Sequence, residues 1–142
     1  MTRGELEDRL ARDHARLRGK SAVLRSLALG VLRGDADLGE TLVLKGRDLQ
    51  RSLVEHMDWE EDILVPNLRR ASPASAAVAD RIHAEHRGQR AELVASIDAL
   101  GEDEKAWVNG RLDGLARELL DLVERLERDM AAEEASLDAL PG

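Results

Sequence analysis

The sequence predicts an all-α fold, an antiparallel up-down-up-down bundle of four helices, with residues 1–142 as a single domain. The first observation is composition: 43% of the residues are apolar, yet the aromatic ones are only Trp59 and Trp107. A core of Leu, Val, Ile and Ala favours helices over sheets. The second observation is that glycine and proline divide the chain into four long segments. The third is that each segment repeats its apolar residues at steps of three, four or seven, as an amphipathic helix does.

The first two helices are predicted from a capping signal and two apolar stripes. Thr2 and Glu5 have the spacing of a capping box, so we expect the first helix to begin there. Its core stripe is Leu10, His14, Leu17, Leu24 and Val31. After a break at Gly30 to Gly39, the second stripe is Leu42, Leu49, Leu53, His56, Glu60 and Ile63. The second helix is expected to end near Pro66.

The last two helices follow the same logic after a break at Pro66 to Pro73. The third stripe is Val78, Ile82, His86, Leu93, Ile97 and Leu100, and Gly101 is the expected C-cap. After the break at Gly101 to Asp103, the fourth stripe is the most regular. It comprises Val108, Leu112, Leu115, Leu119, Leu122, Leu126, Asp129, Glu133, Leu137 and Leu140. Short connections between such helices predict antiparallel neighbours.

The two halves of the chain resemble each other, which indicates duplication of one helical hairpin. An acid-histidine pair lies in the first and third segments, and a pair of polar residues four positions apart lies in the second and fourth. The separation from His14 to His56 almost equals that from His86 to Asp129. We therefore expect a pseudo-twofold core in which these polar residues meet at one level.

Polar residues that interrupt the apolar stripes indicate a metal site. A carboxylate in an apolar core costs several kcal/mol unless it is paired or binds a cation, and no Lys or Arg lies on the core line nearby. The pairs His56/Glu60 and Asp129/Glu133 each place two ligands on one helix face, one turn apart. Since the chain has no cysteine, histidine and carboxylate must hold the metal. The predicted ligands are His14, His56, Glu60, His86, Asp129 and Glu133, enough for two metal ions with positions left open.

The charge of the chain excludes several classes of partner. The net charge is −8, and Lys and Arg are scattered among more numerous acids, which argues against nucleic acid and anionic membranes. No apolar run is long enough for a membrane span, and the first residues are too charged for a signal peptide. We therefore expect a cytoplasmic protein.

The segment around His56 resembles the signature of the hemerythrin-like (HHE cation-binding) family. It reads Glu-His-Met-Asp-Trp-Glu-Glu-Asp-Ile-Leu-Val-Pro over residues 55–66, a His followed four residues later by a Glu-Glu pair and an apolar run ending in Pro. The pairs Asp13-His14 and Glu85-His86 resemble the flanking acid-histidine pairs of that family. The resemblance implies a non-haem centre of two Fe ions. It also implies that Glu60 and Glu133 bridge the irons and that His14, His56 and His86 are terminal ligands.

Position 129 departs from the family pattern, which has His where this chain has Asp. A short Asp129 side chain would leave its iron more open than the other. The competing hypothesis is that Asp129 has lost the ligand role and that its iron site is either empty or completed by His83. For His83 itself, we favour a place at the solvent edge. Glu61 and Glu134 follow the bridging candidates, and we expect both to point toward the helix flank as solvated acids.

Three functions remain open at this stage. The centre reacts with a small oxidant (dioxygen, peroxide or nitric oxide), or it binds dioxygen reversibly as a carrier or sensor, or it belongs to a degenerate bundle with an incomplete metal site. We favour the first, because three carboxylates would nearly neutralise two divalent ions and favour the ferric state. The expected partner is then a small diatomic or peroxide ligand.

Overall fold

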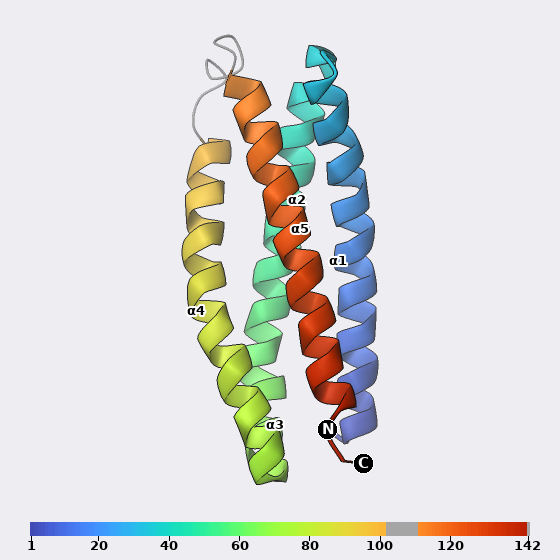
Figure 1. Ribbon diagram of the computed structural model, residues 1–142, viewed down its shortest axis with the longest axis vertical. Coiled ribbons are helices and arrows are strands. Elements are labelled where there is room, and N and C mark those ends of the chain that lie inside the picture. The colour runs from blue at the N-terminus through green and yellow to red at the C-terminus, as the bar shows by residue number, and fades with distance from the viewer. Residues whose placement is uncertain (102–110, 142) are drawn as a thin grey trace.

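A computed structural model describes residues 1–101 and 111–141, and its helices run side by side along one long axis (Figure 1). The elements are α1 (Arg3–Leu32), η1 (Ala36–Leu38), α2 (Gly39–Trp59), η2 (Glu60–Leu64), α3 (Val65–Ala71), α4 (Pro73–Gly101) and α5 (Arg111–Asp138). Because α2, η2 and α3 follow one another without a break, they form one long helix. The chain thus runs up, down, up and down, and both termini lie at the same end. The predicted all-α bundle is confirmed.

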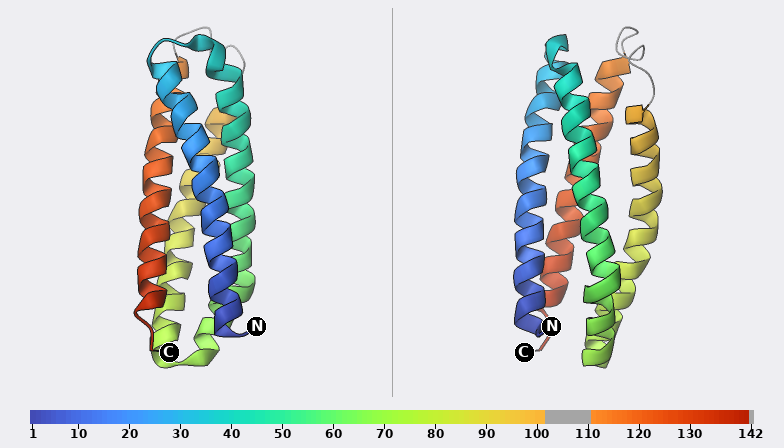
Figure 2. Two further views of the ribbon diagram at one scale, coloured as in Figure 1. Left: turned by 90° about the vertical axis from the view of Figure 1, so that its right-hand side faces the viewer. Right: turned by 180° about the vertical axis from the view of Figure 1, so that it is seen from behind.

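In the part of the bundle that the structure describes, α2 and α5 lie between α1 and α4. α1 packs against α2 and α5, and α4 packs against the same two helices from the opposite side. Figure 2 shows α1 flanked by α5 and α2, with α4 behind them. Among the described helices, none is both long and apolar enough to cross a membrane.

The predicted start of the first helix is confirmed. The Thr2 side chain accepts a hydrogen bond from the backbone N–H of Glu5, and the Glu5 side chain accepts one from the backbone N–H of Thr2. α1 ends at Leu32, inside the predicted break. Gly34 then adopts a φ of 102°, a conformation that glycine enters without steric cost.

The predicted end of the second helix near Pro66 is wrong, because the helix continues to Ala71. The π-helical turn η2 precedes the proline, and the backbone N–H of Val65 donates to the carbonyl of Glu60. Proline has no backbone N–H and its ring crowds the preceding turn, so it normally ends or kinks a helix. Here Pro66 directly follows the π-helical turn, where the regular hydrogen-bond pattern is already interrupted. The chain turns instead at Ser72, whose backbone is extended and whose hydroxyl accepts the N–H of Ser75 at 3.1 Å.

The described core consists of two apolar clusters. The larger lies between α1, α2 and α5 and includes Leu17, Leu24 and Leu49. The smaller lies at the end of the bundle that holds the termini and includes Leu10 and Leu137. On α1 and α5, His14 and Glu133 lie between the two clusters. A layer of polar residues therefore separates the two apolar clusters.

Most of the predicted stripe residues are buried where the structure describes them. The exceptions are partly buried: Ile63, Leu115, Asp129, Glu133 and Leu140. Leu64 and Val65 take the core position near Ile63, within and just after the π-helical turn. Val108 and the proposed break beyond Gly101 lie outside the described residues, as do the side chains of Leu93, Ile97 and Leu100.

We expect Leu49→Ala to destabilise the bundle by about 2–5 kcal/mol, because Leu49 is fully buried in the larger cluster and truncation leaves a cavity. Leu44 lies on the same helix but is 56% exposed, so Leu44→Ala is the matched control, with an expected change within about 0.5 kcal/mol. Equilibrium denaturation in urea measures both. Equal effects from the two variants would contradict the placement of the core.

Candidate metal centre

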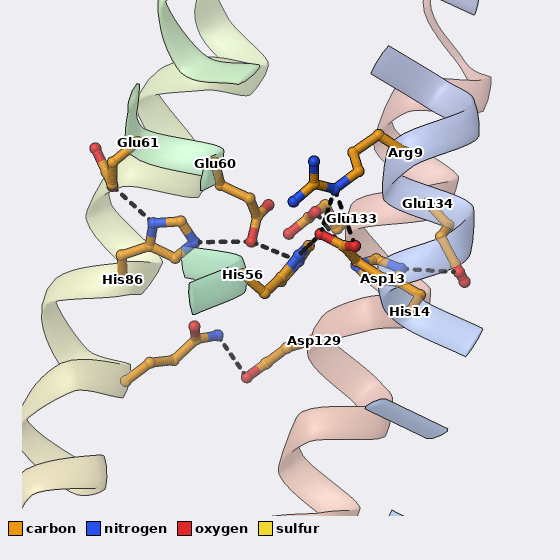
Figure 3. A network of polar contacts seen from close by, with 11 residues as sticks. Arg9, Asp13, His14, His56, Glu60, Glu61, His86, Asp129, Glu133 and Glu134 are labelled. Atoms are coloured by element: carbon orange, nitrogen blue, oxygen red, sulfur yellow. Dashed lines mark hydrogen bonds and ion pairs between the residues drawn. The ribbon is translucent and has the colours of Figure 1, made fainter. Parts of the chain in front are cut away.

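Five of the six predicted ligands meet at one level of the bundle. His14 comes from α1, His56 from α2, Glu60 from η2, His86 from α4 and Glu133 from α5. Figure 3 shows their side chains converging between the helices. The three imidazoles and Glu60 are each at most 5% exposed, and the Glu133 side chain is 9% exposed. The stripe periodicity that predicted this convergence therefore holds for all four helices.

The converging side chains form two overlapping triads. One is His14, His56 and Glu133, and the other is Glu60, His86 and Glu133. Within each triad, one ligand atom per residue lies within 4.8 Å of the others. Glu133 belongs to both triads, which is the geometry expected of a carboxylate that bridges two cations.

Glu60 lies close to histidines of both triads. Its Oε1 lies 2.9 Å from Nε2 of His56 and 3.3 Å from Nε2 of His86. His14 Nε2 lies 3.5 Å from Oε1 of Glu133. The carboxylates of Glu60 and Glu133 together thus lie next to all three imidazoles.

Several ligand atoms in this volume are buried without a hydrogen-bond partner. They are Nε2 of His14, Nε2 of His56, Oε2 of Glu60 and Oε1 of Glu133. Buried polar atoms nearly always have a partner, and leaving one unpaired costs free energy. A cation would satisfy all four atoms, so the residues present fit a bound metal.

Burial and neighbouring charges shift the pKa values of the two carboxyl groups at the centre in opposite directions. Burial raises the pKa of Glu133 well above its ordinary value, and the neighbouring Glu60 raises it further. Burial would also raise the pKa of Glu60, but contacts with Glu133, His56 and His86 outweigh it and lower that pKa. Without metal, a proton shared by the two carboxyl groups therefore favours Glu133 over Glu60.

The imidazoles respond to the same charges. Burial would lower the pKa of His56 and of His86, but their contacts with Glu60 outweigh burial and raise both values. Burial and the neighbouring His56 lower the pKa of His14. A bound cation must displace these protons, since histidine binds metal in its neutral form.

Carboxylates of a second layer orient two of the ligand histidines. His56 Nδ1 donates to Asp13 at 3.0 Å, and His86 Nδ1 donates to Glu61 at 2.6 Å. These bonds leave Nε2 of each ring directed at the centre, as is usual for metal-binding histidine. Arg9 donates to Asp13 at 3.0 Å and lies over the Trp59 ring, 5.2 Å from its centroid.

The expectation that Glu61 and Glu134 are solvated flank acids is therefore wrong. The Glu61 side chain is only 23% exposed and accepts hydrogen bonds from two histidines. Glu134 lies 3.4 Å from Nδ1 of His14 and accepts hydrogen bonds from Arg18. The sequence contained one signal: each acid directly follows a bridging candidate.

His83 lies at the edge of the site. Its side chain is 42% exposed, and its Nδ1 donates to Glu61 at 2.8 Å. The favoured placement at the solvent edge is confirmed, and neither triad in the described residues contains His83.

The structure does not bring Asp129 into either triad formed by the described residues. The Asp129 carboxylate accepts a hydrogen bond from Nε2 of Gln89 at 2.7 Å. Figure 3 shows this carboxylate directed toward α4, away from Glu60 and Glu133. A ligand role for Asp129 remains a prediction. Gln89 was missed because a lone amide on a helix carries no metal-ligand signal.

We expect Glu61→Gln to lower metal affinity about 10–100-fold, the usual cost of losing an outer partner of a ligand histidine. Glutamine offers one acceptor oxygen where Glu61 provides two, each bonded to a histidine. Competition with a coloured chelator measures the affinity. Asp62→Asn, at the neighbouring exposed position, is the control and should leave it unchanged. Equal losses in both variants would contradict the orienting role of Glu61.

Comparison with known proteins agrees with this geometry. The family model of the hemerythrin HHE cation-binding domain matches residues 6–138, nearly the whole chain. Comparison with curated proteins and with solved structures found no significant match. The matched span runs from the first turn of α1 to the last residue of α5 and includes every residue of the two triads. The chain belongs to the hemerythrin HHE cation-binding domain family.

Proposed function

We propose that the protein holds two non-haem iron ions in its core and reacts there with a small oxidant, namely dioxygen, peroxide or nitric oxide. The observation that carries the proposal is the pair of triads that share Glu133, with unpartnered buried atoms directed into both. Imidazole and carboxylate ligands suit iron, and the chain has no cysteine that could select a softer metal. Iron bound there would supply one-electron and dioxygen chemistry.

The residues around the centre restrict what can reach it. Buried ligands lie between two apolar clusters, which exclude bulk water. A cavity of about 30 Å³ lies beside the centre and is lined by Arg9, Asp13, Ser52, Glu55 and His56, among others. It has room for a diatomic molecule or a water but not for an organic substrate. This supports a small ligand.

A second candidate function is reversible dioxygen binding. With Asp129 outside the triads, three imidazoles and two carboxylates remain. Fewer carboxylates weaken the preference for the ferric state that favoured oxidant turnover. The histidine-rich set therefore favours a carrier or sensor more than the sequence alone did.

The test is reconstitution of the purified chain with ferrous iron without oxygen, followed by metal analysis and visible spectroscopy. We expect two irons per chain and a new charge-transfer band when dioxygen, peroxide or nitric oxide is added. A zinc-loaded sample is the control, because zinc has no redox chemistry. A band that disappears when dioxygen is removed supports the second candidate. Iron-loaded protein that responds to none of the three would contradict both functions.

A further inference from the structure

The two triads are chemically unequal. The triad of His14, His56 and Glu133 has two imidazoles, whereas the triad of Glu60, His86 and Glu133 has one. In the duplicated hairpins, the residue that corresponds to His56 is Asp129. The metal position of the second triad is therefore the one with fewer imidazoles.

The side chain that could fill this position is held elsewhere. Asp129 lies one helical turn before Glu133 on α5, hence on the same helix face. Gln89 lies nearly one turn after His86 on α4, and its side chain contacts Asp129 on α5. The 2.7 Å hydrogen bond from Gln89 Nε2 to Asp129 joins the two helices about one turn from Glu133 and His86, and both residues are half-buried.

We propose that Gln89 is a positioning residue that keeps Asp129 off the metal bound by Glu60, His86 and Glu133. That metal then retains an open coordination position for a small exogenous anion. The inference rests on the proposed function only in that the triads hold metal. A hydrogen bond between a neutral amide and an ionised carboxylate is stronger than one between neutral groups. The hydrogen bond from Gln89 must break before the Asp129 side chain can turn to the metal.

The same geometry explains why glutamine suits the task. A Lys or Arg at position 89 would form an ion pair with Asp129, and an apolar residue would leave the carboxylate without this donor. Without this hydrogen bond, Asp129, which lies one turn from Glu133 on the same helix face, should turn to the open position and coordinate. Gln89 thus sets the coordination number of one metal through the side chain that it binds.

The experiment uses cobalt(II) as the metal probe and azide as the exogenous anion, with the full chain. The intensity of the cobalt visible bands reports coordination number, and azide titration reports the open position. In Gln89→Met, Asp129 should coordinate, so the bands should weaken and the azide Kd should rise at least about tenfold. Adding Asp129→Ala to Gln89→Met should restore the azide Kd to the wild-type value. Arg87→Met, at an exposed position on the same helix, is the control.

Three results would overturn the inference. The first is an azide Kd that Gln89→Met leaves unchanged, and the second is a rise in Kd that Asp129→Ala does not reverse. The third is loss of cobalt in the single variant Asp129→Ala, because that residue would then be a ligand in the wild type. Circular dichroism checks that each variant is folded.

The outcomes separate this inference from the proposed function. If the cobalt protein shows the expected azide pattern but the iron protein reacts with no oxidant, only the proposed function fails. If the iron protein reacts but Gln89→Met has no effect on azide, only the inference fails. A folded wild-type chain that binds no cobalt overturns both.

Discussion

Replacing Glu133 by glutamine is expected to abolish binding of both metal ions while the bundle stays folded. Glu133 is the residue that both triads share, and glutamine has nearly the same shape but no charge to bridge two cations. The affinity loss should exceed the about 10–100-fold cost of removing an outer-layer partner. Metal analysis after gel filtration measures the retained ions in variant and wild type.

The control for this substitution is Glu118→Gln, on the exposed face of the same helix, which should retain both ions. The metal-free variant offers a second measurement. In the metal-free protein, burial and Glu60 raise the pKa of Glu133 and so favour its neutral form, which glutamine resembles. Metal-free Glu133→Gln should therefore be at least as stable as metal-free wild type. A variant that keeps both ions would contradict the bridging role.

Chelation of the metal is expected to lower the melting temperature of the wild-type protein by about 10 °C. A ligand that binds only the folded state at 100 to 1,000 times its Kd stabilises it by about 2.7–4.1 kcal/mol, and each kcal/mol shifts the Tm of a chain this size by about 3 °C. Metal removal also leaves the buried atoms of Glu60 and Glu133 unpartnered. Thermal unfolding followed by circular dichroism, with and without chelator, measures the shift. An unchanged Tm after verified metal removal would count against a buried site.

The decrease in Tm on chelation should become larger as the pH rises from about 6 to about 8. In the metal-free protein His56 and His86 have raised pKa values, so their stabilisation is complete below the ordinary histidine pKa and is lost as the pH rises through the folded values. Glu133, whose pKa is also raised, acts in the same direction. The lowered pKa of His14 acts in the opposite direction, but it is one group against three.

The stabilisation that the bound metal provides should instead increase as the pH rises. Metal displaces the protons of the same histidines, so its affinity and its stabilisation increase as protons become scarce. Unfolding of matched samples at three pH values tests the divergence. A constant gap between the two melting temperatures would contradict the coupling of metal to these histidines.

The sequence alone determined the bundle and the convergence of five polar residues. Helical periodicity specifies which residues share a face, and burial of the apolar face then forces His14, His56, Glu60, His86 and Glu133 inward. Each of them interrupts a stripe of leucine and similar residues, so local sequence was sufficient to find it. The end of α1 was predicted from a different local signal, the break at Gly30 to Gly39, within which Gly34 has a positive φ.

The tertiary structure alone decided which atoms face one another across helices. Asp13 directly precedes His14 in the sequence, yet its carboxylate accepts a hydrogen bond from His56 on another helix. Asp129 has the right period for a ligand but bonds to Gln89 on α4. Such pairings depend on the axial rotation and height of each helix relative to the next, which periodicity within one helix does not contain. The π-helical turn adds to this, because one widened turn both carries the chain past Pro66 and contains Glu60 and Glu61, which contact His86 from two sides.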